Sequence, residues 1–163
     1  MQNPPPPPPP PSGPPPMMPP PGAGYPMAAP AGNLASPGLR IVGGLIDFII
    51  LVVVVAIINL IIRDRTYVIS TVVGLVVFIG YHTYFVGTRG QTIGMMVFGF
   101  HVRDIVTGQT PTMGKAALRG FMWWLEVQLT ICIIGAIGWL WQLWDPQKQA
   151  IHDKVAGTIV TTS

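Results

Sequence analysis

The chain contains very little charge. Only 9% of its 163 residues are Asp, Glu, Lys or Arg, and the first 39 residues carry no charge at all. Ordinary globular domains contain about 25% charged residues, which keep the water-exposed surface free of large apolar patches. The deficit therefore argues against a soluble globular protein. The few basic residues lie in short runs beside apolar segments rather than along one face, so we expect no nucleic-acid partner.

Cysteine is nearly absent as well. The single Cys132 excludes an intramolecular disulfide and the multi-cysteine zinc patterns, and its apolar surroundings predict a small buried residue. The chain also lacks a glycine-rich phosphate loop, a nucleophile elbow and a pair of carboxylates placed for acid–base catalysis. From these absences we expect no enzyme, no cofactor and no metal site.

Long apolar runs are what the chain does contain. The first covers residues 41–62 and includes one charged residue, Asp47. As a helix it would be about 33 Å long at about 1.5 Å per residue, enough to cross a bilayer core of about 30 Å. The second run, residues 68–86, carries no formal charge and ends in aromatic residues of the kind found at the headgroup interface. We therefore predict two transmembrane helices.

A third apolar segment covers residues 116–144 and allows two interpretations. Residues 127–144 are free of charge and long enough for a single, marginal span. Gly135 and Gly138 can instead break the segment into a re-entrant helical hairpin. The hairpin returns the C-terminus to the membrane side on which the N-terminus lies. Arg63 and Arg65 are then the only basic residues on the opposite side of the membrane. Length favours the span, and the positive-inside tendency favours the hairpin.

Residues 1–39 form a proline-rich tail. Seventeen of the nineteen prolines lie in it, including an unbroken run from Pro4 to Pro11. Proline fixes φ and cannot donate a backbone hydrogen bond, so we predict a disordered, polyproline II-like segment that does not pack. Such a tail either binds the aromatic groove of a polyproline-binding protein or serves as a spacer.

The rest of the chain, residues 40–163, is predicted to form one membrane domain. Residues 98–106 partly alternate between apolar and polar side chains, and the Thr-Gly-Gln sequence at 107–109 supplies a turn, so we expect a small β-hairpin at the membrane surface. Thr112 is a suitable N-cap for a helix that begins near Met113. The predicted fold class is an all-α integral membrane protein with two transmembrane helices, a third apolar segment, a surface β-hairpin and a disordered tail.

Asp47 is the first candidate for a functional role. A carboxylate at the centre of a transmembrane helix costs about 2.5–3.5 kcal/mol, so it must face protein or water. Arg40 lies seven residues earlier, which places both side chains on one helix face. The pair is either an ion or proton site in which Arg40 tunes the pKa of Asp47, or a structural pair. In the second case Arg40 reaches the headgroups and Asp47 ties the first helix to a polar group elsewhere.

Other polar and aromatic residues occur in the apolar segments. Arg119 and Glu126 have the same seven-residue spacing and form either a second intramembrane site or an interfacial pair. His82 is interpreted either as an intrahelical donor or as a proton carrier. Five tryptophans are predicted to form interfacial belts rather than a substrate cage. They are Trp123, Trp124, Trp139, Trp141 and Trp144.

Several short motifs follow one another in a fixed order. They are Arg40 with Asp47, Gly90-Gln91-Thr92-Ile93-Gly94, Val102-Arg103-Asp104 leading into Gly108, Arg119, and His152-Asp153-Lys154 followed by Gly157-Thr158-Ile159-Val160. Together they resemble the RDD family of bacterial membrane proteins over about residues 38–161. The resemblance implies that the arginine and the two aspartates that define the family are Arg40, Asp47 and Asp153. One position departs from the family, because Met95 stands where a basic residue is common.

The three residues implied by the resemblance can meet only if the C-terminus returns to the side where Arg40 enters the membrane. The hairpin interpretation of the third segment allows this, and the single span does not. His152, next to Asp153, is then either a proton relay near neutral pH or a solvated loop histidine. The resemblance also implies transport, with cation/proton antiport in some members of the family.

Two functions follow from these expectations. In the first, the protein transports a small ion or solute across the bacterial inner membrane, with cation/proton exchange at the intramembrane Asp47 as one option. Two or three spans cannot enclose a pathway, so it would work as a homo-oligomer in the lipid bilayer. In the second, it is a non-transporting adaptor that recruits a partner through the proline-rich tail, which lies in the cytoplasm.

Overall fold

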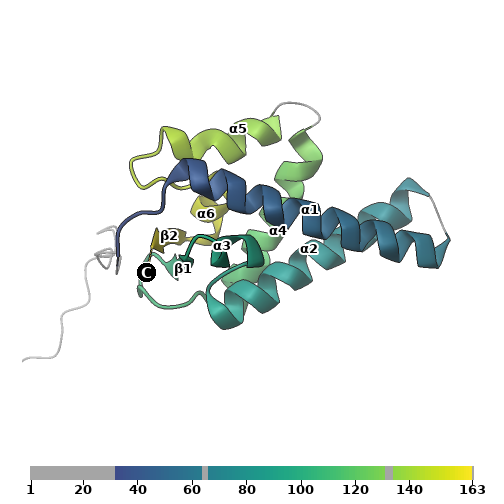
Figure 1. Cartoon of the computed structure of the whole chain (residues 1–163), viewed down its shortest axis with the longest axis horizontal. Coiled ribbons are helices and arrows are strands. Elements are labelled where there is room, and N and C mark those ends of the chain that lie inside the picture. The colour runs from purple at the N-terminus through teal and green to yellow at the C-terminus, as the bar shows by residue number, and fades with distance from the viewer. Residues whose placement is uncertain (1–31, 64–65, 131–133, 163) are drawn as a thin grey trace, which may run out of the picture.

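The computed structural model describes residues 32–63, 66–130 and 134–162. Most of the proline-rich tail (residues 1–31), Arg65 and Cys132 lie outside the described residues, so what the sequence predicts for them stays a prediction. In the described part of the chain, helices dominate, and one small sheet joins two segments that are far apart in the sequence (Figure 1).

Two long apolar helices form the extended end of the molecule. α1 (Pro37–Ile62) and α2 (Tyr67–Arg89) run antiparallel and project beyond the other elements (Figure 1). Only 11% of the most apolar stretch of α1 and 17% of that of α2 is buried. Faces that are both apolar and uncovered require lipid around them, because water would have to hydrate them at a large cost in free energy. The two predicted long apolar helices are confirmed.

α1 begins inside the segment that the sequence assigns to the tail. Pro37 occupies its first turn, where the missing proline N–H is not needed. The residues just before it belong to the folded domain as well. Leu34 pairs with Thr161, and the buried Ala35 donates its N–H to the carbonyl oxygen of Val160 (3.0 Å). The folded part of the chain therefore starts a few residues earlier than expected.

The predicted strand is present, but the expectation of a local β-hairpin is wrong. β1 (Phe100–Asp104) pairs antiparallel with β2 (Thr158–Thr162), close to the other end of the chain. The turn after β1 folds back only far enough for the Asp104 N–H to reach the carbonyl oxygen of Gln109 (2.8 Å). Pro111 then follows, and its missing N–H cannot continue a ladder. The second strand therefore comes from a distant segment.

The third apolar segment is divided into two helices that fold back on each other. α4 (Met113–Leu129) is capped by Thr112, as predicted, and α5 (Ile134–Leu140) returns beside it (Figure 1). A side chain at Gly135 would collide with α4, because its Cβ would lie 1.9 Å from the carbonyl oxygen of Glu126. This arrangement corresponds to the hairpin interpretation and not to a single continuous helix. The expected position of the break is wrong, because α4 ends at Leu129 and both Gly135 and Gly138 lie within α5.

Short elements complete the domain. α3 (Ile93–Met96) packs on α1, and a 3-10 turn (Trp141–Leu143) follows α5. α6 (Ile151–Ala156) packs on α4 and leads directly into β2. The antiparallel pair of β1 and β2 therefore helps to hold α6 against α4.

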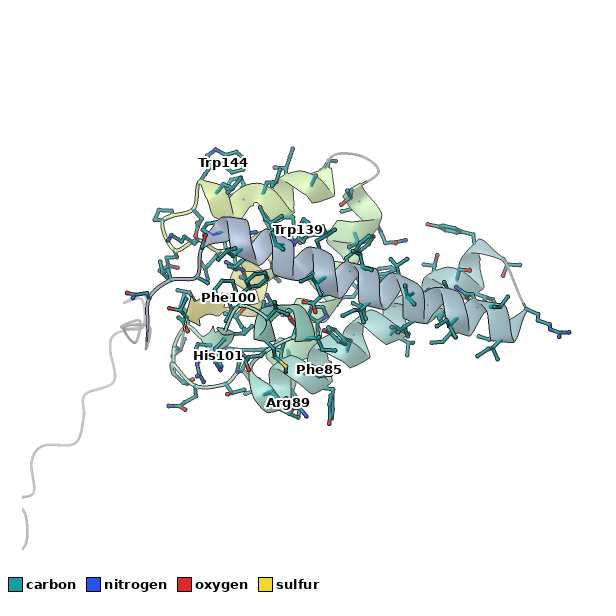
Figure 2. The ribbon with its side chains drawn as sticks, in the orientation of Figure 1. Phe85, Arg89, Phe100, His101, Trp139 and Trp144 are labelled. Atoms are coloured by element: carbon teal, nitrogen blue, oxygen red, sulfur yellow. The ribbon has the colours of Figure 1, made fainter. Side chains whose placement is uncertain are left out.

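The tryptophans divide into two groups. Figure 2 shows Trp144 pointing away from the helices, and it is 68% exposed, in keeping with an interfacial position. Trp123, in contrast, is buried, with its ring 5.3 Å from that of Phe78 and 6.4 Å from that of Trp139. The prediction of an interfacial belt is therefore wrong for Trp123, which packs inside the domain between α2 and α5.

Candidate functional site

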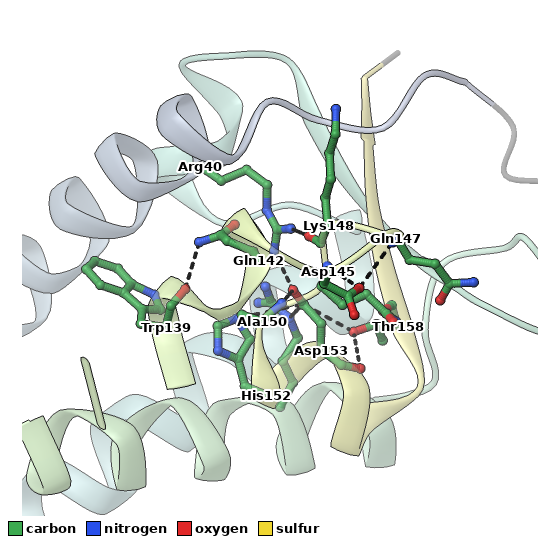
Figure 3. Close-up of polar contacts among 12 residues, drawn as sticks. Arg40, Trp139, Gln142, Asp145, Gln147, Lys148, Ala150, His152, Asp153 and Thr158 are labelled. Atoms are coloured by element: carbon green, nitrogen blue, oxygen red, sulfur yellow. Dashed lines mark hydrogen bonds and ion pairs between the residues drawn. The ribbon is translucent and has the colours of Figure 1, made fainter. Parts of the chain in front are cut away.

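Asp153 is the meeting point of buried charges from three helices. Its side chain is fully buried and pairs with Arg40 of α1 (Figure 3) and with Arg119 of α4, whose Nε lies 3.0 Å from Oδ1. The N–H of Ala150 also donates to Oδ2 (3.2 Å), and the hydroxyl of Thr158 to Oδ1 (3.5 Å). Burial alone would raise the pKa of Asp153, but the two guanidinium groups outweigh it and hold that pKa well below its usual range. Asp153 is therefore a stable carboxylate.

The loop before α6 presents its backbone to this centre. Arg40 also donates to the carbonyl oxygen of Lys148, a residue in the left-handed region with φ 51° (Figure 3). The carboxylate of Asp145 holds the loop by accepting the N–H groups of Gln147 (3.1 Å) and Gln149 (3.0 Å). Arg40 is thus bound by both a side chain and a backbone carbonyl, which fixes the start of α1 to the C-terminal segment.

Glu126 and His152 form a second buried pair beside Asp153. Oε1 of Glu126 accepts the backbone N–H of His152 (3.0 Å), and Oε2 lies 2.8 Å from the ring nitrogen Nδ1. The other ring nitrogen, Nε2, lies 3.7 Å from Oδ1 of Asp153. Since Nδ1 faces a carboxylate, it carries the hydrogen, and the ring sits between two acids. Both side chains are buried, so the interpretation of His152 as a solvated loop residue is wrong. The position of Glu126 relative to the membrane interface stays a prediction.

Asp47 does not pair with Arg40. Its carboxylate accepts hydrogen bonds from the hydroxyl groups of Tyr81 (2.6 Å) and Thr92 (2.5 Å) and from the N–H of Gly94 (2.7 Å). Arg40 turns instead to α6, so the two side chains that share one face of α1 do not contact each other in an ion pair. The geometry corresponds to the alternative in which Asp47 ties the first helix to polar groups elsewhere, here on α2 and at the start of α3.

Two glycines make the Asp47 contact possible. A Cβ on Gly94 would lie 2.0 Å from the carbonyl oxygen of Gly43, and a Cβ on Gly43 would lie 3.1 Å from that of Gly94. α1 and α3 thus touch through their backbones. This close approach is what brings the Gly94 N–H within reach of Asp47.

A small polar cavity lies between the Asp153 and Asp47 centres. Its volume is about 20 Å³, room for one water molecule. Among the described residues that line this cavity, two have a buried polar side-chain atom without a hydrogen-bond partner, Nε of Arg40 and Oε1 of Gln142. A water molecule in the cavity can accept from the first atom and donate to the second. The polar residues that line the cavity are Arg40, Asp47, His82, Arg119, Gln142 and His152.

His82 reaches this cavity from the middle of α2. Its Nδ1 lies 3.1 Å from the carbonyl oxygen of Phe78, so Nδ1 carries the hydrogen and Nε2 is left as the acceptor. Gly120 of α4 provides the space, because a Cβ there would lie 2.7 Å from the Cβ of His82. His82 is therefore an intrahelical donor, as one interpretation of the sequence has it, and it also lines the polar cavity.

The buried charges in and beside the polar cavity do not cancel. Three carboxylates face two guanidinium groups, and two buried histidines lie beside them. With both histidines neutral, one negative charge is in excess, and a poorly hydrated environment favours its neutralisation by a proton or a cation. The residues are Asp47, Glu126 and Asp153; Arg40 and Arg119; and His82 and His152.

Three residues of the site were not identified from the sequence: Tyr81, Thr92 and Gln142. Tyr81 lies in an aromatic cluster typical of the headgroup interface, but its hydroxyl points inward to Asp47. Thr92 lies just before a helix and two residues before Gly94. The free N–H groups at such a helix start bind acidic groups, so this pattern could have indicated that Thr92 and Gly94 bind a carboxylate. Gln142 is the one amide side chain among the apolar residues 139–144, and this isolated polar group could have indicated a buried polar site.

Over residues 32–63, 66–130 and 134–162, no three His, Cys, Asp or Glu side chains converge where a metal ion could sit. What the described site offers chemically is a set of carboxylates, imidazoles and hydroxyl groups that exchange hydrogen bonds and protons.

Comparison with known proteins shows which family the chain is similar to. The chain is 31% identical to a proline-rich antigen homolog of Mycobacterium tuberculosis over 86 residues, which is 53% of this chain and 34% of that protein. It is 32% identical to the proline-rich antigen of Mycobacterium leprae over 73 residues, 45% of this chain and 27% of that protein. The chain thus spans about a third or less of the length of these relatives, and no solved structure matches it. Residues 34–157, which contain both long apolar helices and all the buried charges of the site, match the RDD family model. The chain is a membrane protein that belongs to the RDD family.

Proposed function

We propose that the protein transports a small ion or solute across the bacterial inner membrane in exchange for protons. The observation that carries the proposal is the excess negative charge around a buried polar cavity, in a domain whose long helices require lipid. A membrane domain gains nothing in stability from an unbalanced buried charge, whereas an exchanger needs a group that binds either a proton or a cation. The role proposed is therefore transport and not catalysis.

Asp47 supplies a link between proton uptake and helix position. As a carboxylate it accepts three hydrogen bonds, which hold α2 and α3 against α1. A proton on Asp47 turns one acceptor oxygen into a donor and weakens this hold. The protonated and ionised forms thus favour different helix arrangements, which is the condition for coupling a proton to a conformational change. His82 and His152 line the same cavity.

The pathway requires more than one copy of the chain. Two long helices and a hairpin cannot enclose an aqueous route, and the outer faces of α1 and α2 are exposed and apolar. The proposed assembly is a homo-oligomer in the lipid bilayer, with the proline-rich tail in the cytoplasm.

The test is proton-coupled flux in liposomes that contain the purified full-length chain. Under Na⁺, K⁺ and H⁺ gradients, we expect the wild-type protein to couple proton movement to a cation and Asp47→Asn to abolish this flux without preventing membrane insertion. Asp104→Asn is the matched control, because Asp104 is also a buried acid but pairs with Lys115 (2.5 Å) and does not line the polar cavity. Unchanged flux in Asp47→Asn would remove Asp47 from the mechanism, and no coupled flux in the wild-type protein would refute transport of these ions.

Recruitment of a partner through the tail is a second candidate function. Residues 33–35 are attached to β2, so the tail leaves the domain at a defined place beside the sheet. Both relatives carry proline-rich in their names, which fits a role for such a segment in them. Deletion of residues 1–31 separates the two candidates, because it should remove recruitment of a polyproline-binding protein and leave flux intact.

A further inference from the structure

A second, larger cavity lies between α1, α4 and α5. Its volume is about 370 Å³, within the range of small-molecule sites. Apart from Glu126 and Thr130, the residues that line it are apolar. Leu45 is one of them and is 48% exposed, so the cavity opens onto the lipid-facing surface of α1.

The apolar cavity and the polar cavity share a wall. Trp123 and Trp139 line both cavities. Glu126 lines the apolar cavity and is bonded to His152, which lines the polar one. Trp139 lies tightly against α1, because a Cβ at Gly44 would lie 2.6 Å from its ring. A ligand in the apolar cavity would thus lie beside Glu126 and be separated from the polar cavity by the side chains of Trp123 and Trp139.

The lining of this cavity has the chemistry of a site for an apolar cation. Phe48, Trp123 and Trp139 provide aromatic rings, whose faces attract positive charge. Glu126 is the one acid among the lining residues, and its partner His152 donates N–H bonds to it without cancelling its charge when the imidazole is neutral.

We propose that the apolar cavity binds a lipophilic monovalent cation, with its apolar body among Phe48, Trp123 and Trp139 and its charge beside Glu126. The excess negative charge of the buried cluster selects a cation over an anion of the same shape. A neutral lipid chain fits the apolar walls but gains nothing from Glu126. The proposal deepens the proposed function by naming the class of solute, and it rests on that function only for the claim that the bound cation is carried.

Binding is tested separately from flux, on the purified full-length protein in nonionic detergent. The probes are tetraphenylphosphonium and tetraphenylborate, which have nearly the same shape and opposite charge. Quenching of tryptophan fluorescence reports on binding, because two tryptophans line the cavity. We expect saturable binding of the cation at least about tenfold tighter than that of the anion, which corresponds to about 1.4 kcal/mol.

Three variants locate the site. Glu126→Gln should weaken cation binding by about tenfold and remove the preference for the cation. Ala136→Phe fills the cavity without touching any ion pair and should abolish binding, which keeps the proposal testable if Glu126→Gln fails to fold. Ile137→Phe is the control on the same helix, because Ile137 is 50% exposed and does not line the cavity, and it should bind like the wild-type protein.

Equal affinity for the two ions would overturn the proposal and indicate an apolar cavity filled by lipid chains. Unchanged cation binding in Ala136→Phe would overturn it as well, because the ion would then bind elsewhere. Cation binding without any coupled flux would support the site and refute transport of this ligand. Coupled flux of Na⁺ or K⁺ without binding of tetraphenylphosphonium would support transport and refute a lipophilic solute.

Discussion

Asp153 is the residue on which the buried electrostatics depend most directly. It forms ion pairs with both Arg40 and Arg119, two guanidinium groups that are themselves almost completely buried. A buried ion pair adds little net stability over an apolar packing of the same shape, but removal of one partner leaves a charge without compensation. The loss should therefore be much larger than that of an exposed pair.

We expect Asp153→Asn to lower the free energy of unfolding by about 3–5 kcal/mol, measured by chemical denaturation in detergent micelles. Lys154→Gln, at the next residue, is the control. It breaks the pair with Asp145 at a position where the lysine side chain is 41% exposed, and should cost about 1 kcal/mol or less. Losses of similar size in the two variants would contradict the central role of Asp153.

The same denaturation experiment, repeated at different pH values, gives a second readout. The folded-state pKa of Asp153 lies below its ordinary value of 3.8, so its contribution to stability is fully present above pH 3.8. That contribution is lost as the pH falls from 3.8 toward the lower folded-state value. The acid-induced loss should be smaller in Asp153→Asn, although Asp104 and Asp145, whose pKa values are also lowered, keep part of it.

At the residue scale, the sequence could identify Arg40, Asp47 and Asp153 but not their pairing. Seven-residue spacing places Arg40 and Asp47 on one helix face, and the structure agrees. It does not determine which way a long arginine side chain turns, and Arg40 turns to α6 because the chain returns there. The three hydrogen-bond donors to Asp47 could not be predicted from the sequence either. They come from α2 and from the start of α3, and no local sequence pattern determines how these helices pack against α1.

At the scale of elements, the contact between α1 and α3 limits what position 94 can hold. Gly94→Ala would place a Cβ 2.0 Å from the backbone carbonyl oxygen of Gly43, and a backbone atom cannot move aside as a side chain can. We expect this variant to have a free energy of unfolding that is lower by at least about 1–3 kcal/mol in the same denaturation assay, because overpacking forces the two helices apart.

Gly80→Ala is the matched control for this prediction. Gly80 lies in the interior of α2, and a Cβ there meets nothing within 4 Å. Replacing glycine by alanine inside a helix should therefore stabilise it by about 0.5–1 kcal/mol. If Gly94→Ala were as stable as Gly80→Ala, α1 and α3 would not be in backbone contact.

Among the elements, the long helices and the start of α4 could be predicted because their signals are local. Apolar runs of sufficient length give α1 and α2, and the Thr112 cap gives the start of α4. β2 could not be predicted, because Thr158 to Thr161 are all buried and the strand shows no alternation between a polar and an apolar face. Because the sequence does not predict β2, the turn signal directly after β1 predicted that β1 pairs with the segment that follows that turn, as in a hairpin.

At the scale of the whole molecule, the sheet and the Asp153 centre hold both ends of the membrane domain together. Leu34 pairs with Thr161, and Arg40 pairs with Asp153 (Figure 3). The C-terminal end of α1 and the first turn of α2 lie at the opposite, projecting end (Figure 1). The division of α4 and α5 into a hairpin is what allows this closure, since a single continuous helix would carry the C-terminus away from Arg40.

This closure predicts the sidedness of three positions, tested by single cysteines in a Cys132→Ala background. Asn33→Cys and Val155→Cys are exposed and lie at the same end of the domain, so both should react with a membrane-impermeant maleimide only after spheroplasts are permeabilised. Arg63→Cys, at the exposed end of α1, should react in intact spheroplasts. The reason is that lipid must surround the uncovered faces of α1 and α2, which puts the two ends of α1 in different compartments. Labelling of Val155→Cys together with Arg63→Cys in intact spheroplasts would mean that the third segment crosses the bilayer, and the buried pair of Arg40 and Asp153 could not then exist.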